Sequence, residues 1–336
     1  MKPTIEILYK DQHYNIPNNW DAVTPEDFRY LVEAFGRMAL GEVSPGEIRL
    51  RLLCRFMHWN LQKVKDDDSM ATLLALSSQL TFLFRIDYGK DNDLLDDLSA
   101  EDREICSRID PYHNKMPLAR ALRRLQYHYV PDLCFAGQKV PGINVGKNTY
   151  EGYRILHRDE VLTTSLTALQ YLEAQQLLQR MDGIGEEQLQ SQLTLLAAIL
   201  YYPDKRYSSE GAHSFAQELE GLDMITLQSI MINFQAFTSF LFERTQFSLL
   251  TKIEGKTPAL ITTDGIDALY DLAKDGLGNV DDVEQINLIT YLRLVRKKTI
   301  DAVRQMKDMD WDMAKISKES GLPVRIVEKI IKSKIK

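Results

Sequence analysis

The chain has 336 residues, of which 44% are hydrophobic and 26% charged, a composition typical of an ordered globular protein with one large or two smaller domains. The formal net charge of -7 is uneven, because residues 293–336 carry 13 basic and 6 acidic side chains, whereas residues 1–292 carry 28 and 42. The acidic body should therefore repel polyanions, whereas the basic end should attract them.

Residues 1–20 are predicted to form a β-hairpin arm. Apolar and polar residues alternate over 4–16, which places Ile5, Ile7 and Tyr9 on one face of a strand. A lone hairpin is unstable in water. We therefore expect the arm to pack on the helical body or to add a strand to the sheet of a partner protein.

Residues 21–108 are predicted to form an N-terminal helical subdomain. Thr24 and Ser44 each precede a proline and stand three positions before an acidic residue, which is a signal for a helix N-terminus. The aspartates at 66–68 are expected to cap a third helix over 70–84 rather than to bind calcium, because consecutive aspartates cannot all face one ion.

Residues 109–158 are predicted to form an irregular segment rich in proline, glycine and aromatic residues. The histidines in and around it lack both a helical i, i+4 pair and adjacent carboxylates, so we expect no metal site; they are His113, His128 and His157. The stretch 142–149 contains Gly-Lys but lacks the first glycine, the preceding strand and the following helix of a phosphate-binding loop. No nucleotide site is therefore expected here.

Residues 159–310 are predicted to form a C-terminal helical subdomain. Helices are expected over 161–181, 186–202, 208–219 and 223–250. The last of these is apolar on all sides, which predicts a buried core helix. A later helix over 283–309 changes from apolar to basic along its length.

Residues 311–336 are predicted to form a basic helix-turn-helix-like tail. With Gly321 in the turn, Ile316, Val327 and Ile330 fall at the buried positions of a DNA-reading helix pair. The side chains expected to contact a partner or nucleic acid are Arg325, Lys329, Lys332, Lys334 and Lys336.

Two residues of this tail depart from the usual motif. Ser317 stands where a small alanine is common, and Pro323 stands at the start of the second helix. The same pattern is found in small helical modules that bind only protein. The tail is therefore interpreted first as a protein-docking unit, with Trp311 holding it to the body, and second as a DNA-binding unit.

No known catalytic signature is present, because the chain lacks a Gly-x-Ser-x-Gly elbow, a His-Glu-x-x-His pair and a dinucleotide glycine fingerprint. The cysteines are odd in number and far apart, which argues against disulfides and a zinc site; they are Cys54, Cys106 and Cys134. We also find no run of 18 apolar residues. We expect no catalysis, no cofactor, no metal, no small-molecule substrate and no membrane span.

The segment 16–28, IPNNWDAVTPEDF, resembles the start of tail-associated proteins in phages and prophages of the Bacteroidetes, and 267–276, DALYDLAKDG, resembles a segment of the same group. The resemblance implies a structural or assembly protein, a chaperone or connector without cofactor. Its partners would be other tail or assembly components, possibly including further copies of itself. It would be located in the cytoplasm or in a virion-like particle assembled there.

The predicted fold class is mainly α, a multi-helix body with a small N-terminal β-hairpin and a C-terminal helix-turn-helix-like pair. The predicted function is a non-enzymatic phage or prophage tail-associated protein that acts through protein contacts. The alternative is a DNA-binding regulatory protein that uses the C-terminal helix-turn-helix.

Overall fold

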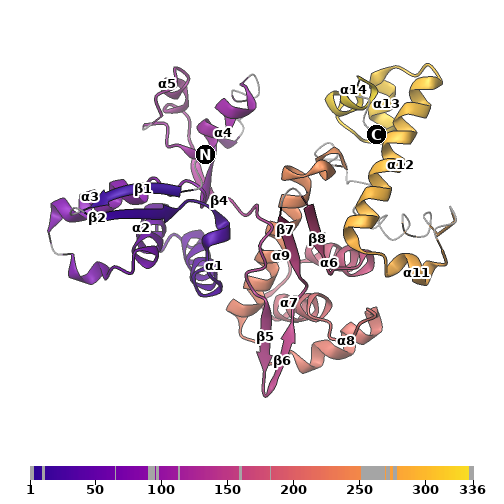
Figure 1. Cartoon of the computed structure of the whole chain (residues 1–336), viewed down its shortest axis with the longest axis horizontal. Helices are drawn as coiled ribbons and strands as arrows, with labels where there is room; N and C mark the ends of the chain where they lie inside the picture. The colour runs from indigo at the N-terminus through magenta and orange to yellow at the C-terminus, as the bar shows by residue number, and fades with distance from the viewer. Residues whose placement is uncertain are drawn as a thin grey trace. The chain divides into compact units, whose positions relative to one another are not determined.

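The computed structural model describes residues 4–9, 12–64, 66–89, 95, 98–112, 114–158, 161–181, 183–250, 269, 273–274 and 278–332 (Figure 1). The chain divides into two compact units, Met1–Leu133 and Cys134–Lys336, so the boundary falls inside the predicted irregular segment 109–158. Helices predominate in both units, which confirms a mainly α fold. Among the described residues, short antiparallel two-stranded sheets occur at four places, whereas the sequence predicts strands only at the N-terminus.

The first unit consists of β1 Thr4–Tyr9, β2 Gln12–Pro17, α1 Pro25–Ala39, α2 Pro45–Phe56, α3 Asp67–Ser77, β3 Phe84–Asp87, α4 Ala100–Arg108, α5 Ala119–Leu122 and β4 His128–Pro131, with 3-10 turns η1 Trp20–Ala22 and η2 Leu61–Lys63. Strand β1 pairs with β2, and β3 pairs with β4. The register of the first pair places Ile5 opposite Ile16 and Ile7 opposite Tyr14. The hairpin therefore has one apolar face.

The helix starts of this unit follow the predicted capping signals. The side chains of Thr24, Ser44 and Asp66 each accept a hydrogen bond from the amide three residues on, at 3.1, 3.1 and 2.7 Å. The predicted helix over 70–84 is too long, because α3 ends at Ser77 and Phe84 begins β3. A short apolar run after a helix can be either more helix or a buried turn and strand. Its periodicity does not distinguish the two.

Helices α1 and α2 end in the same way with different residues. Gly41 follows α1 with φ of 75°, and His58 follows α2 with φ of 53°. The next amide closes each end, from Glu42 to the carbonyl of Arg37 at 2.9 Å and from Trp59 to the carbonyl of Cys54 at 2.8 Å. This Schellman arrangement requires a left-handed residue, for which glycine has no steric cost.

Opposite exchanges at these two ends should change stability in opposite directions. Gly41→Ala is expected to lower the free energy of unfolding by about 1 kcal/mol, because a side chain disfavours the left-handed backbone. His58→Gly should raise it by up to about 1 kcal/mol, since relief of that cost outweighs the larger backbone entropy of glycine. Urea denaturation of the full chain tests both; a loss of stability in His58→Gly would indicate that the imidazole makes a stabilising contact.

The second unit consists of β5 Gly142–Val145, β6 Asn148–Glu151, β7 Ile155–Arg158, β8 Val161–Thr164, α6 Ala168–Arg180, α7 Glu186–Leu200, α8 Ser209–Glu218, α9 Met224–Arg244, the 3-10 turn η4 Gln246–Leu250, α11 Val280–Glu284, α12 Leu288–Asp308, α13 Met313–Ser320 and α14 Val324–Lys332. Strand β5 pairs with β6, and β7 pairs with β8. The segment 267–276, which carries the second part of the resemblance, lies mostly outside the described residues.

Helix α9 is the core helix of the second unit, as predicted. Its buried residues are Leu227, Ser229, Ile230, Asn233, Phe234, Ala236, Phe237 and Leu241. The large apolar members, Leu227, Ile230, Phe234, Phe237 and Leu241, pack in one cluster with buried residues of α6 and α7, among them Tyr171 and Leu196. By length and composition alone α9 could also cross a membrane. Its position inside the core accounts for the same composition.

The Gly-Lys stretch of 142–149 forms a β-hairpin. Val145 pairs with Asn148, which leaves Gly146 and Lys147 as a two-residue turn. Gly146 has φ of 59°, the left-handed geometry that such tight turns require. A turn requirement therefore explains this glycine without a phosphate ligand.

Helix α12 belongs to two hydrophobic clusters. Its first half, including Leu288 and Leu292, packs in the large cluster around α9. Its second half contributes to a smaller cluster, which we call the terminal module: Leu249, Ile300, Val303, Ile316, Leu322, Val327 and Ile330. One continuous helix thus carries the terminal module on the body of the second unit (Figure 1).

Candidate functional site

The exposed face of α14 is the first candidate site. Ile316, Val327 and Ile330 are fully buried in the terminal module, as their spacing predicts. Arg325 and Lys329 are exposed and make no ion pair within the described part of the chain, whereas exposed Lys332 pairs with Glu328. Lys334 and Lys336 lie outside the described residues.

The two unusual residues of the terminal helix pair have clear local roles. Ser317 is buried, and its hydroxyl donates a 2.6 Å hydrogen bond to the carbonyl of Leu322. Gly321 adopts φ of 68° in the turn. The carbonyl of Pro323 accepts from the amides of Ile326 and Val327, at 2.8 and 3.1 Å, so proline caps α14 rather than interrupting it. Both residues are therefore compatible with a tightly turned helix pair.

Trp311 joins α12 to α13. Asp310 follows the end of α12 with φ of 61°, and the amide of Trp311 bonds to the carbonyl of Met306 at 3.2 Å. The indole packs against the terminal module, and the Lys315 ammonium lies 3.8 Å from its ring centre. This contact agrees with the predicted role of Trp311 and uses one lysine in a cation–π interaction.

The N-terminal hairpin is the second candidate. Ile7 and Ile16 are buried, Ile5 is partly buried, and Tyr14 packs edge-on against Trp59 at 5.2 Å. The apolar face thus lies on the helical body, whereas Leu8 on the other face is 63% exposed. The side chain of Tyr9 lies outside the description. Each strand has one partner in the described sheet, which leaves the outer edges open.

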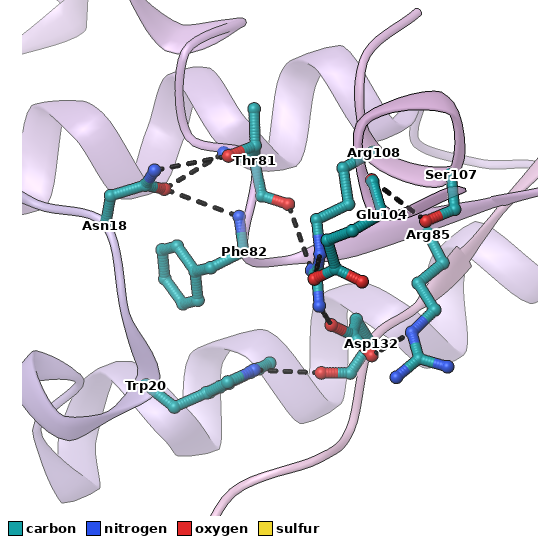
Figure 2. Close-up of polar contacts among 9 residues, drawn as sticks. All are labelled: Asn18, Trp20, Thr81, Phe82, Arg85, Glu104, Ser107, Arg108 and Asp132. Atoms are coloured by element: carbon teal, nitrogen blue, oxygen red, sulfur yellow. Dashed lines mark hydrogen bonds and ion pairs between the residues drawn. The ribbon is translucent and has the colours of Figure 1, made fainter. Parts of the chain in front are cut away.

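A buried ionic network centred on Asp132 has no signal in the sequence (Figure 2). Asp132 forms ion pairs with Arg85, at 2.6 Å, and with Arg108. Both Asp132 and Arg108 are 5% exposed. The Trp20 indole donates to the Asp132 carbonyl at 2.8 Å, and Arg108 also pairs with Glu104 at 2.6 Å. The network binds the end of the first unit to three earlier segments.

A second polar cluster lies in the same unit, and its buried cation contacts aromatic rings instead of carboxylates. The Arg49 guanidinium lies 5.1 Å from the ring centre of Phe84 and 4.9 Å from that of Tyr129, and burial lowers its pKa. Tyr129 donates to Asp110 at 2.7 Å. Burial, with Asp110 nearby, raises the pKa of Tyr127 to about 12. These tyrosines stay neutral at physiological pH and act as hydrogen-bond donors.

Asn233 holds the irregular segment at the start of the second unit through side-chain hydrogen bonds. It is 1% exposed in the middle of α9. Its side-chain oxygen accepts from the amides of Lys139 and Val140 at 2.6 and 3.3 Å, and its nitrogen donates to the carbonyl of Gly137 at 2.9 Å. A single amide therefore satisfies three backbone groups of an irregular segment.

Two buried tyrosines near this segment should respond differently to loss of the hydroxyl. Tyr201 donates to the carbonyl of Val140 at 2.5 Å, whereas the Tyr153 hydroxyl is buried without a hydrogen bond among the described residues. Tyr201→Phe is expected to cost about 1–2 kcal/mol and Tyr153→Phe to be neutral or stabilising. Thermal unfolding of the two variants measures the difference; equal losses would indicate an ordered water on Tyr153.

Two grooves contain groups that could act chemically. One, of about 660 Å³ in the first unit, is lined by Tyr30, Arg51, Cys54, Arg55, His58, Trp59, Asn60, Leu61 and Gln62. Arg51 pairs with Glu47 at 2.7 Å and Arg55 with Asp27 at 2.5 Å. Burial raises the pKa of the Cys54 thiol, which disfavours the reactive thiolate. The groove thus has internally paired charges and a protonated thiol.

The other groove, of about 540 Å³, lies in the second unit between the start of α6 and the loop after α7. Two of its tyrosine hydroxyls bond to carboxylates of the protein, Tyr207 to Glu173 and Tyr150 to Glu218. No cluster of three or more metal-ligating side chains occurs among the residues the structure describes. His128 lies 3.4 Å from Asp87, His157 packs against Phe240, and His113 lies outside the described residues.

Comparison of the chain with protein-family models, curated proteins and solved structures finds no match.

Proposed function

We propose that this protein is a non-enzymatic, tail-associated structural or assembly component that acts through protein contacts in the cytoplasm or in a particle assembled there. The observation that carries the proposal is the β1–β2 hairpin. Its apolar face is occupied by the helical body, while the outer strand edges remain open in the described sheet. Open edges are suited to strand addition by a partner. The resemblance of residues 16–28 to tail proteins supports the same assignment.

Leu8 provides a substitution that tests this contact. Leu8→Lys adds a charge beside the open edge without altering buried Ile7, and charged edges oppose strand pairing. Leu40→Lys is the matched control, since Leu40 is 76% exposed at the end of α1. The full chain is co-expressed with the proteins encoded by its neighbouring genes and analysed by size exclusion. We expect Leu8→Lys alone to lose the complex; a wild-type chain that stays monomeric would contradict the proposal.

DNA binding by a C-terminal helix-turn-helix is the second candidate function. Burial of Ile316, Val327 and Ile330, with Arg325 and Lys329 exposed, matches the division that such a motif uses. The stripe of basic side chains lies on the side of α14 opposite the module core. This arrangement supports contact with phosphates.

Neutralising the basic stripe tests DNA binding better than deleting the tail. Deletion of residues 312–336 would expose the apolar side chains of Ile300 and Val303. The triple variant R325A/K329A/K332A removes three positive charges, and K63A/K147A/K205A removes three exposed ones elsewhere. Titration with duplex DNA should lose about 2–3 units of salt slope in the first variant only. Equal affinity and slope in both triple variants would exclude α14 as the DNA contact.

A further inference from the structure

The exposed side of α14 differs in chemistry from one end to the other. At its first turn Val324 is 48% exposed beside Arg325. One and two turns later the exposed cations are Lys329 and Lys332, and Lys332 pairs with Glu328. An apolar side chain and a planar guanidinium thus stand together at the N-terminal end, followed by point charges.

Helical geometry directs these groups away from the terminal module. At about 100° per residue, Arg325, Lys329 and Lys332 fall within an arc of about 60°. The buried residues Val327 and Ile330 lie on the opposite side of the helix. The helix has 9 residues. Its length is therefore about 13.5 Å. An α-helix with its side chains is about 10–12 Å across, so its exposed side can enter the DNA major groove, which is about 12 Å wide.

We propose that α14 reads base sequence through its first turn, an inference that rests on the DNA-binding candidate function. Arg325 presents two parallel donors to the O6 and N7 acceptors of a guanine, and Val324 contacts the methyl group of a neighbouring thymine. Lys329 and Lys332 contact phosphates, which set the position of the helix without reading sequence. The ligand is duplex DNA that contains a guanine beside a thymine.

The alternative occupant of this face is an acidic protein surface. Such a surface is recognised by charge, so a lysine at position 325 would serve nearly as well as Arg325. A guanine edge is matched best by the fork of the guanidinium, whose two parallel donors the single ammonium of lysine does not provide. The exposed Val324 side chain also has a specific partner in a thymine methyl. These two neighbouring groups favour DNA.

Charge-conserving exchanges separate base reading from phosphate contact. The full chain is first incubated with a randomised duplex library, and bound DNA is sequenced. R325K and K329R are then compared with wild type on the enriched duplex and a scrambled one. We expect an enriched motif with a guanine, a loss of about 10–100-fold on the enriched duplex for R325K, and little change for K329R. Unchanged unfolding curves verify the fold of both variants.

The possible failures identify which statement is wrong. Binding without an enriched motif, or full discrimination by R325K, would overturn base reading while DNA binding itself stands. Absence of binding to any duplex at 50 mM salt would overturn both the inference and the candidate function, and would direct attention to an acidic protein partner.

Discussion

Replacing Asp132 with asparagine should lower the free energy of unfolding of the first unit by about 3–5 kcal/mol, because removal of one partner leaves buried charge unpaired. Asp132 is the shared partner of Arg85 and Arg108. Arg108 is 5% exposed, so water cannot replace the lost carboxylate. Arg108 keeps its pair with partly exposed Glu104 and a long hydrogen bond, 3.4 Å, to the carbonyl of Thr81, and these compensate only in part.

The loss can be measured by urea denaturation with Trp20 as the reporter. Its indole bonds to the Asp132 carbonyl, and a W59F/W311F background removes the other two tryptophans from the signal. Glu26→Gln is the control, since the Glu26 side chain is 88% exposed in its pair with Arg55 and should contribute less than about 1 kcal/mol. A similar small loss in Asp132→Asn would mean that the network is hydrated.

Local features of this fold follow from the sequence because they depend on neighbouring residues. The caps at Thr24, Ser44 and Asp66 involve amides three positions away. The burial of Ile316 and Val327 follows from helical spacing and the intervening turn. Such features need no knowledge of distant segments, and the sequence predicts each of them.

Contacts that join distant segments cannot be predicted from local sequence patterns. Trp20 and the Asp132 carbonyl are separated by 112 positions, and Lys139 and Asn233 by 94. A single polar residue gives no sign of which backbone groups it will meet. Strands β3 and β4 are absent from the prediction for a related reason, since each takes its partner from a distant segment and has only four residues. Whether such a short segment forms a strand therefore depends on its tertiary partner, which sequence periodicity does not reveal.

The candidate interaction surfaces can be predicted only in part from the sequence. Spacing alone places Arg325 and Lys329 opposite the buried side of α14, and the structure agrees. The open edge of the hairpin depends on which strands pair, and the structure limits β1 to β2 among the described residues. The partner of either surface requires the binding experiments, because shape and charge define a class of ligand rather than a molecule.

Replacing Asn233 with alanine should produce a comparably large loss in the second unit, about 3–5 kcal/mol. Three hydrogen bonds disappear together. The amide of Lys139 and the carbonyl of Gly137 lose their side-chain partner, whereas the amide of Val140 keeps a 3.1 Å bond to the side-chain oxygen of Gln138. Each buried backbone group without a partner costs about 1–3 kcal/mol, and part of this is recovered if the segment moves toward water. The loss should therefore exceed that of Tyr201→Phe, which breaks one bond to the same segment.

Gln235→Ala is the matched control for this substitution, because it removes an amide two residues further along α9 at an exposed position. Its effect should be below about 0.5 kcal/mol. Hydrogen exchange resolves the mechanism: in Asn233→Ala the Lys139 amide should lose protection, while α9 residues such as Phe237 keep theirs. Loss of protection throughout α9 would instead mean that Asn233 supports the core helix itself, and retained protection at Lys139 would contradict its role in holding the segment.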